Sequence, residues 1–65
     1  MENSMNYEII NHLIIVHFSG EIDCSNAPIY RQSLSDLFEN TKEDIIFDFK
    51  NTSFIDSSGI GLVLG

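Results

Sequence analysis

The chain has 65 residues, 43% of them hydrophobic, and ten acidic against three basic residues give a net charge of −7 at pH 7. This acidity argues against nucleic acid and against an anionic membrane surface as partners, because both are bound through clustered lysine and arginine. Cys24 is the single cysteine, which excludes an internal disulfide and a metal site built from several cysteines. With no charged-then-apolar leader and no apolar run of about 18 residues, we expect a soluble, cytoplasmic protein.

Two strands are predicted first, over residues 6–11 and 13–19, with a tight turn at Asn11-His12. Asparagine tolerates the positive φ that such a turn often needs. Alternate side chains of a strand share one face. The set of the second strand expected to face the core is Ile14, Val16 and Phe18. Gly20 is expected to end this strand.

A helix is predicted over residues 26–41, because apolar side chains recur there at helical spacing. Its expected packing face comprises Ala27, Tyr30, Leu34, Leu37 and Phe38. Ser25 is the expected N-cap, and Pro28 falls in the first turn, where its missing N–H loses no internal bond. A third strand is predicted over residues 44–49, and a strand-helix-strand order favours a right-handed crossover between parallel strands.

The segment after the third strand carries the most chemical information. A polar loop and a buried Phe54 are expected to lead into Asp56, Ser57, Ser58 and Gly59 at the first turn of a second helix. Backbone N–H groups point outward there without a partner in the helix, so an anion is favoured. A serine at such a place is interpreted either as a helix cap or as the hydroxyl that receives a phosphate.

The βαβ unit, the corner from Gly20 to Asp23 and the run FIDSSGIG from Phe54 to Gly61 together resemble the STAS domain family. Its best-known members are bacterial anti-sigma factor antagonists. The resemblance implies an α/β fold with a mixed sheet and packed helices in the order β-β-α-β-α, continued by further strands and helices. We therefore interpret residues 1–65 as one partial domain, and expect a homo-oligomer if they are the whole molecule.

The resemblance also implies a function in transcription regulation, without enzymatic activity. The unmodified antagonist binds an anti-sigma factor that is also a serine kinase, and this frees a sigma factor. The kinase transfers a phosphoryl group from ATP to the first serine after the aspartate, which is Ser57 here, and a phosphatase removes it. No catalytic residue, cofactor or metal is implied. The surface expected to bind the partner comprises Asp23, Asp56, Ser57, Ser58 and Gly59.

Structural interpretations stand beside these functional ones. Ser58 is interpreted as structural, Asp56 as a cap, and Asp23 equally as a brace of the first helix or as a neighbour of the phosphorylation site. A phosphate adds about −1.5 to −2 charge at neutral pH. Because Asp56 adjoins Ser57 and Asp23 is expected nearby, we expect a switch by interface electrostatics and not by unfolding. A scaffold subunit of a stress-signalling complex and an accessory or tail module of a transporter are the alternative functions.

Three other patterns could indicate a dinucleotide site, a metal site or a serine hydrolase, and each is explained better in another way. Glycines 59, 61 and 65 have the spacing of a dinucleotide fingerprint, but nine residues separate them from the predicted strand, so close helix packing explains them better. His12 and His17 fall on opposite strand faces, which favours exposed residues over a metal site. No G-x-S-x-G elbow occurs and no histidine is placed beside Ser57, which argues against a serine hydrolase.

Overall fold

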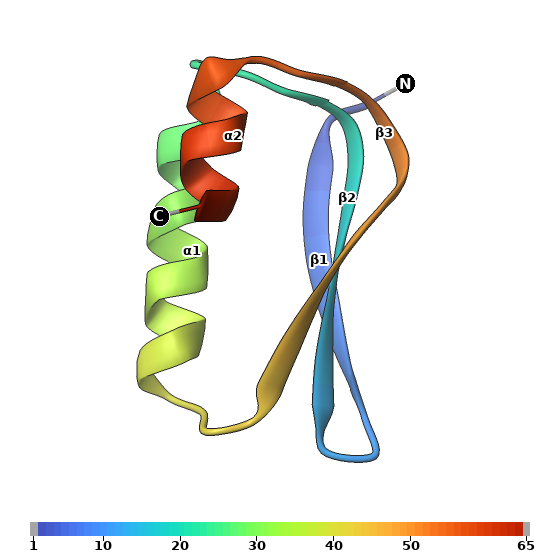
Figure 1. The fold of residues 1–65 in the computed structure, drawn as a ribbon, viewed down its shortest axis with the longest axis vertical. Coiled ribbons are helices and arrows are strands. Elements are labelled where there is room, and N and C mark those ends of the chain that lie inside the picture. The colour runs from blue at the N-terminus through green and yellow to red at the C-terminus, as the bar shows by residue number, and fades with distance from the viewer. Residues whose placement is uncertain (1, 65) are drawn as a thin grey trace.

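The computed structural model describes residues 2–64, which form a three-stranded sheet with two helices on one face (Figure 1). The elements in chain order are β1 (Ser4–Ile10), β2 (Leu13–Ile22), α1 (Ala27–Glu39), β3 (Asp44–Ile55) and α2 (Ser57–Leu64). The strand order is β1-β2-β3, with β1 antiparallel to β2 and β2 parallel to β3. The predicted mixed sheet and the β-β-α-β-α order are therefore confirmed.

The turn between β1 and β2 is the predicted one. Asn11 and His12 both have positive φ, 50° and 66°, and Ile10 pairs directly with Leu13 across the hairpin. Two-residue turns of this kind match the right-handed twist of the strands that they join.

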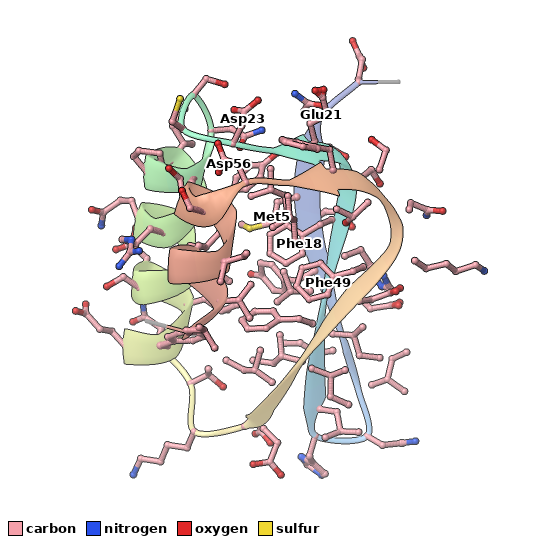
Figure 2. The ribbon with its side chains drawn as sticks, turned by 45° about the horizontal axis from the view of Figure 1, so that its top comes forward. Met5, Phe18, Glu21, Asp23, Phe49 and Asp56 are labelled. Carbon is pink, nitrogen blue, oxygen red and sulfur yellow. The ribbon has the colours of Figure 1, made fainter. Side chains whose placement is uncertain are left out.

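The core lies between the sheet and the helices, and β2 supplies most of it. Ile14 and Val16 are fully buried and Phe18 is 1% exposed, as predicted. The ring of Phe18 stacks on Phe49 with 5.2 Å between centroids (Figure 2), and burying such a side chain stabilises the fold by roughly 1.5–3 kcal/mol. The remaining buried residues come from the end of β2 and from both helices: Ile22, Ala27, Tyr30, Leu34 and Leu62.

Strand β2 continues past Gly20, so the prediction that this glycine ends the strand was wrong. Gly20 has φ +79°, a conformation that glycine adopts readily and other residues do not. A Cβ there would also collide with the side chain of Asn3, whose Oδ1 accepts the N–H of Glu21 at 2.9 Å. Gly20 is a bend inside the strand, which extends to the fully buried Ile22.

Strand β3 is longer than predicted. Residues 44–49 form only its first half, and the segment predicted as a polar loop continues the strand to Ile55. The extra length comes with a change of register. His17 pairs with Asp48 but Ser19 pairs with Asn51, so β3 contains one extra residue at this point, and a second shift follows between Gly20 and Glu21. Such bulges bend a strand, and β3 curves strongly over the sheet (Figure 1).

Phe54 is 53% exposed, so the prediction of a core position was wrong. It pairs with Glu21 of β2, which is also exposed. The next residue, Ile55, packs against the core, and successive strand residues point to opposite faces. Phe54 therefore faces away from the helices.

Helix α1 is shorter at both ends than the predicted range 26–41. Pro28 lies in its first turn, as predicted. Of the expected packing face, Leu37 is half-buried and contacts the core, but Phe38 is 47% exposed and lies at the margin of the packed face, contrary to prediction. Within residues 2–64, neither helix is long and apolar enough to cross a membrane.

Candidate functional site

Both helices begin at the end of the sheet where the parallel strands β2 and β3 finish (Figure 1). The loop of residues 23–26 follows β2 there, and Asp56 connects β3 to α2. The N–H of Asp56 donates to the carbonyl of Ile22 at 3.1 Å, which joins the two strand ends. Open α/β sheets bind their ligands at the carboxyl ends of their strands. The predicted site residues lie in this loop, at the connection and in the first turn of α2: Asp23, Asp56, Ser57, Ser58 and Gly59.

Asp56 caps α2 and holds the two segments together. Its Oδ1 accepts the N–H of Ser58 at 2.8 Å and that of Gly59 at 3.1 Å. Its Oδ2 accepts the N–H of Cys24 at 3.2 Å, across 32 positions of the chain. The interpretation of Asp56 as a cap is confirmed, since its side chain satisfies two N–H groups that a helix start leaves without partners.

This cap changes the expectation that an added anion is favoured at the start of α2. The N–H of Ile60 donates to the carbonyl of Asp56 at 3.0 Å, and the carboxylate already occupies the N–H groups of Ser58 and Gly59. The positive end of the helix dipole is thus paired with a charge of the chain itself. A further anion would have to displace this carboxylate or lie beside it.

The two serines differ in access. Ser57 is the first residue of α2 and is exposed, whereas Ser58 is half-buried. Ser58 lines a hollow between the helices together with Cys24 and Arg31. Exposure therefore makes Ser57 the more accessible hydroxyl, in agreement with the interpretation of Ser58 as structural.

Gly59 allows α2 to lie close to the end of β2. It is buried, and a Cβ at this position would stand 2.9 Å from Cγ2 of Ile22 and 3.1 Å from its carbonyl oxygen. Close helix packing, the interpretation preferred over a dinucleotide site, accounts for this glycine. Gly61 is different, because the nearest atom to its Cβ position is Nη2 of Arg31 at 3.8 Å, an ordinary contact distance.

Asp23 braces the loop that leads into α1. Its Oδ1 accepts both the hydroxyl of Ser25 at 2.5 Å and the N–H of that serine at 2.9 Å. These bonds, the hydroxyl first, lower the pKa of the Asp23 carboxyl, so its negative charge is maintained at neutral pH. Asp23 also lies at the same end of the fold as Asp56 (Figure 2), so the two interpretations of this residue are compatible.

Ser25 does not cap α1, so that prediction was wrong. The residue at the N-cap position is Asn26, whose side chain makes no capping bond. Its Oδ1 accepts the N–H of Asp23 at 2.9 Å and its Nδ2 donates to the carbonyl of Glu21 at 2.8 Å. The Ser25 hydroxyl is engaged by Asp23, and the carbonyl of Asp23 accepts the N–H of Ala27 at 2.8 Å. The loop, and not a serine cap, therefore organises the start of this helix.

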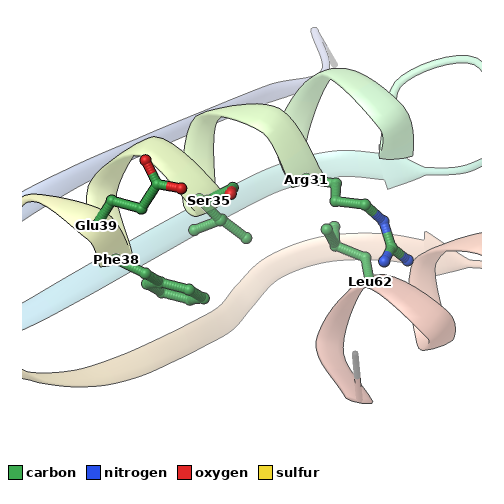
Figure 3. A pocket seen from close by; sticks show the side chains of 6 residues that line it. Arg31, Ser35, Phe38, Glu39 and Leu62 are labelled. Atoms are coloured by element: carbon green, nitrogen blue, oxygen red, sulfur yellow. The ribbon is translucent and has the colours of Figure 1, made fainter.

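A hollow of about 400 Å³ lies between α1 and α2, and Phe38 of α1 and Leu62 of α2 line it (Figure 3). A second hollow, of about 600 Å³, is lined by Ser58 and shares the lining residues Arg31 and Ser35 with the first. Arg31 is the one basic side chain of α1, and it borders both hollows. Sequence reasoning placed it on the polar face and did not connect it with the site, although its position as the sole cation of the helix was a usable signal.

Neither histidine is near Ser57. His12 lies in the hairpin turn at the opposite end of β2, and His17 bonds to Glu8 and Asp48 within the sheet. No group of three or more His, Cys, Asp or Glu side chains in the described part of the chain is arranged to hold a metal ion. The prediction that both are exposed strand residues is correct only for the exposure of His12, since His12 lies in the turn and the side chain of His17 is about one third exposed.

The family model of the STAS domain matches residues 4–65. The chain belongs to the STAS domain family. It is 35% identical over 54 residues to the anti-sigma F factor antagonist of Paenibacillus polymyxa, covering 82% of this chain and 46% of the relative. It is 38% identical over 52 residues to the anti-sigma-B factor antagonist of Bacillus subtilis, covering 80% and 47%.

Solved structures show the same STAS fold. The anti-sigma factor antagonist SpoIIAA in its unphosphorylated form has a TM-score of 0.76 and 33% identity, with 95% of this chain and 58% of that chain covered. An anti-sigma factor antagonist from Mycobacterium paratuberculosis has a TM-score of 0.89 at 22% identity, covering 97% and 54%. The chain spans about half the length of the curated relatives that it matches.

Proposed function

We propose that this STAS chain acts as an anti-sigma factor antagonist whose binding is switched off by phosphorylation of Ser57. The carrying observation is an exposed serine directly after the capping Asp56, at the start of α2, in a chain whose relatives are named anti-sigma factor antagonists. The structure of the related SpoIIAA is that of its unphosphorylated form, which supports a phosphorylation switch in that protein.

The proposed partner is an anti-sigma factor with serine kinase activity. The γ-phosphoryl group of ATP passes to Oγ of Ser57, the hydroxyl proton leaves, and ADP is released. A phosphatase hydrolyses the product and restores the serine. In this proposal the STAS chain is a cytoplasmic, non-enzymatic regulator that binds the kinase and thereby frees a sigma factor.

The geometry of the cap supports an electrostatic switch. A phosphate on Ser57 adds about −1.5 to −2 charge next to the Asp56 carboxylate, which already occupies the N–H groups of the helix start. Asp23 adds a second carboxylate at the same end of the fold (Figure 2). Because Asp56 already accepts the N–H groups of Ser58 and Gly59, the helix start compensates less of the phosphate charge, and like charges brought together at an interface cost several kcal/mol.

The site is tested by incubating the protein with ATP and an anti-sigma factor kinase that co-purifies with it, followed by peptide mass spectrometry. The phosphate is expected on Ser57, and Ser57→Ala should abolish it while the matched control Ser58→Ala is still modified. Titration calorimetry then tests the switch: Ser57→Asp should bind the anti-sigma factor roughly tenfold or more weakly than Ser57→Ala. A phosphate on Ser58 or Ser53, or equal affinities of the two variants, would contradict the proposal.

A further inference from the structure

The face of the sheet opposite the helices carries one polar network that links all three strands. His17 of β2 lies between an acid of each neighbouring strand. Its Nε2 is 2.8 Å from Oε1 of Glu8 on β1, and its Nδ1 is 2.7 Å from Oδ2 of Asp48 on β3. The side chains of His17 and Asp48 are about one third exposed, and that of Glu8 is about half exposed.

The number of N–H donors on the imidazole ring determines which protonation state of His17 fits this arrangement. An ionised carboxylate only accepts hydrogen bonds, and a neutral imidazole has one N–H, whereas imidazolium has two. Both ring nitrogens face a carboxylate oxygen at hydrogen-bond distance. Only the protonated ring therefore satisfies both acids, and its loss of a proton leaves a ring lone pair facing a carboxylate lone pair.

The network also reaches the bend in β3. The second oxygen of Asp48, Oδ1, accepts the N–H of Lys50 at 2.9 Å. This bond lies where the register of β3 first shifts, between the pairs His17–Asp48 and Ser19–Asn51. The same carboxylate thus holds the bulge with one oxygen and the imidazole ring with the other.

We propose that His17 is a proton-operated latch that, when protonated, ties β1, β2 and β3 together and fixes the bulge of β3. This inference concerns the sheet and is independent of the function proposed for Ser57. Because β3 continues from this bulge, through the second register shift, to Ile55 and the following Asp56, the latch couples the protonation of one histidine to the path of the strand that leads to the site.

The charged groups around His17 determine the pH range of the latch. The bonds to Glu8 and then to Asp48 raise the pKa of His17 above its ordinary 6.5, and the N–H of Lys50 and then His17 lower the pKa of Asp48 below 3.8. The Lys50 charge also favours ionised Asp48. The helices lie on the opposite face (Figure 1), so β1 and β3 supply the facing charges.

The sign of the effect on stability follows from these shifts. A raised histidine pKa contributes stability that is complete below 6.5 and is lost as the pH rises through the folded-state value. A lowered aspartate pKa contributes stability that is present above 3.8 and is lost as the pH falls through the folded-state value. The latch is therefore closed between the folded-state pKa of Asp48, which is below 3.8, and the folded-state pKa of His17, which is above 6.5, and it opens when the pH leaves this range on either side.

The test is a pH titration of the unmodified protein by nitrogen-detected NMR of its histidine rings. His17 should carry protons on both ring nitrogens above pH 6.5, and the backbone amide signal of Lys50 should move with the same midpoint. His12, in the exposed hairpin turn, supplies a second histidine in the same spectra. A midpoint for His17 at or below 6.5, or a Lys50 amide that does not follow it, would overturn the proposal.

Two matched variants separate the latch from general electrostatics. Glu8→Gln should lower the His17 midpoint, whereas Glu21→Gln removes the same charge from an exposed position on β2 and should leave it nearly unchanged. The protein with His17 should have a higher urea midpoint of unfolding than His17→Gln, and this difference should become smaller as the pH rises. Equal midpoint shifts for the two glutamine variants would mean that net charge, and not the latch, controls His17.

Discussion

Replacing Asp56 by alanine would remove the capping bonds of α2 and its connection to the loop after β2. Loss of an N-cap costs about 0.5–2 kcal/mol, and loss of the exposed bond from Cys24 adds about 0.5–1.5 kcal/mol. The sum predicts a free energy of unfolding lower by about 2 kcal/mol, or a melting temperature lower by roughly 8–16 °C for a domain of this size. Asp56→Asn keeps one acceptor oxygen and should lose about half as much.

Urea denaturation followed by circular dichroism measures this difference. All variants are compared at one protein concentration, because association with a second copy would shift the midpoint by mass action. Asp44→Ala, at the exposed first residue of β3, serves as the control and should stay within about 0.5 kcal/mol. The reasoning is refuted if Asp56→Ala also stays within that margin, or if Asp56→Asn is the less stable of the two.

Two more predictions concern packing and association. Gly59→Ala should destabilise the fold by about 1–3 kcal/mol, because its Cβ would press on Ile22. The control Gly61→Ala should be neutral or stabilising, since alanine favours a helix by about 1 kcal/mol over glycine. Equal melting temperatures of the two variants would contradict this prediction. The 65 residues by themselves should self-associate at micromolar concentration, because β1 and β3 are edge strands of the described sheet and Tyr7 and Ile9 of β1 are more than half exposed. Sedimentation equilibrium showing a folded monomer would disprove it.

The parts of the fold that follow a strict residue period could be predicted from the sequence. The alternation in β2 identified Ile14, Val16 and Phe18 as core residues, and all three are buried. The order of elements predicted parallel pairing of β2 and β3, because a helix between two strands leaves little topological choice. Local turn chemistry was sufficient for the hairpin at Asn11.

Features that depend on tertiary contacts could not be predicted in this way. A glycine after a predicted strand is readily taken as its end, and only the pairing of Glu21 and Ile22 with β3 shows that the strand continues beyond Gly20. Phe54 was assigned to the core because it is apolar, but in the sheet it pairs with the exposed Glu21 and faces the same side as that residue. In the site, the capping role of Asp56 could be predicted from its position before the helix. Its bond to the N–H of Cys24 joins residues 32 positions apart, so no local sequence pattern indicates it.

The two bulges of β3 also determine which insertions and deletions this strand tolerates. From His17 to Ile22, β2 advances five residues, while β3 advances seven from Asp48 to Ile55. Because β3 has two extra residues, an even number, the side chains after the bent region face the same sides of the sheet as they would without the bulges. Ile55 therefore still points into the core. Deleting one residue would reverse the facing of every later side chain in the strand, whereas deleting two would straighten the strand and preserve their facing.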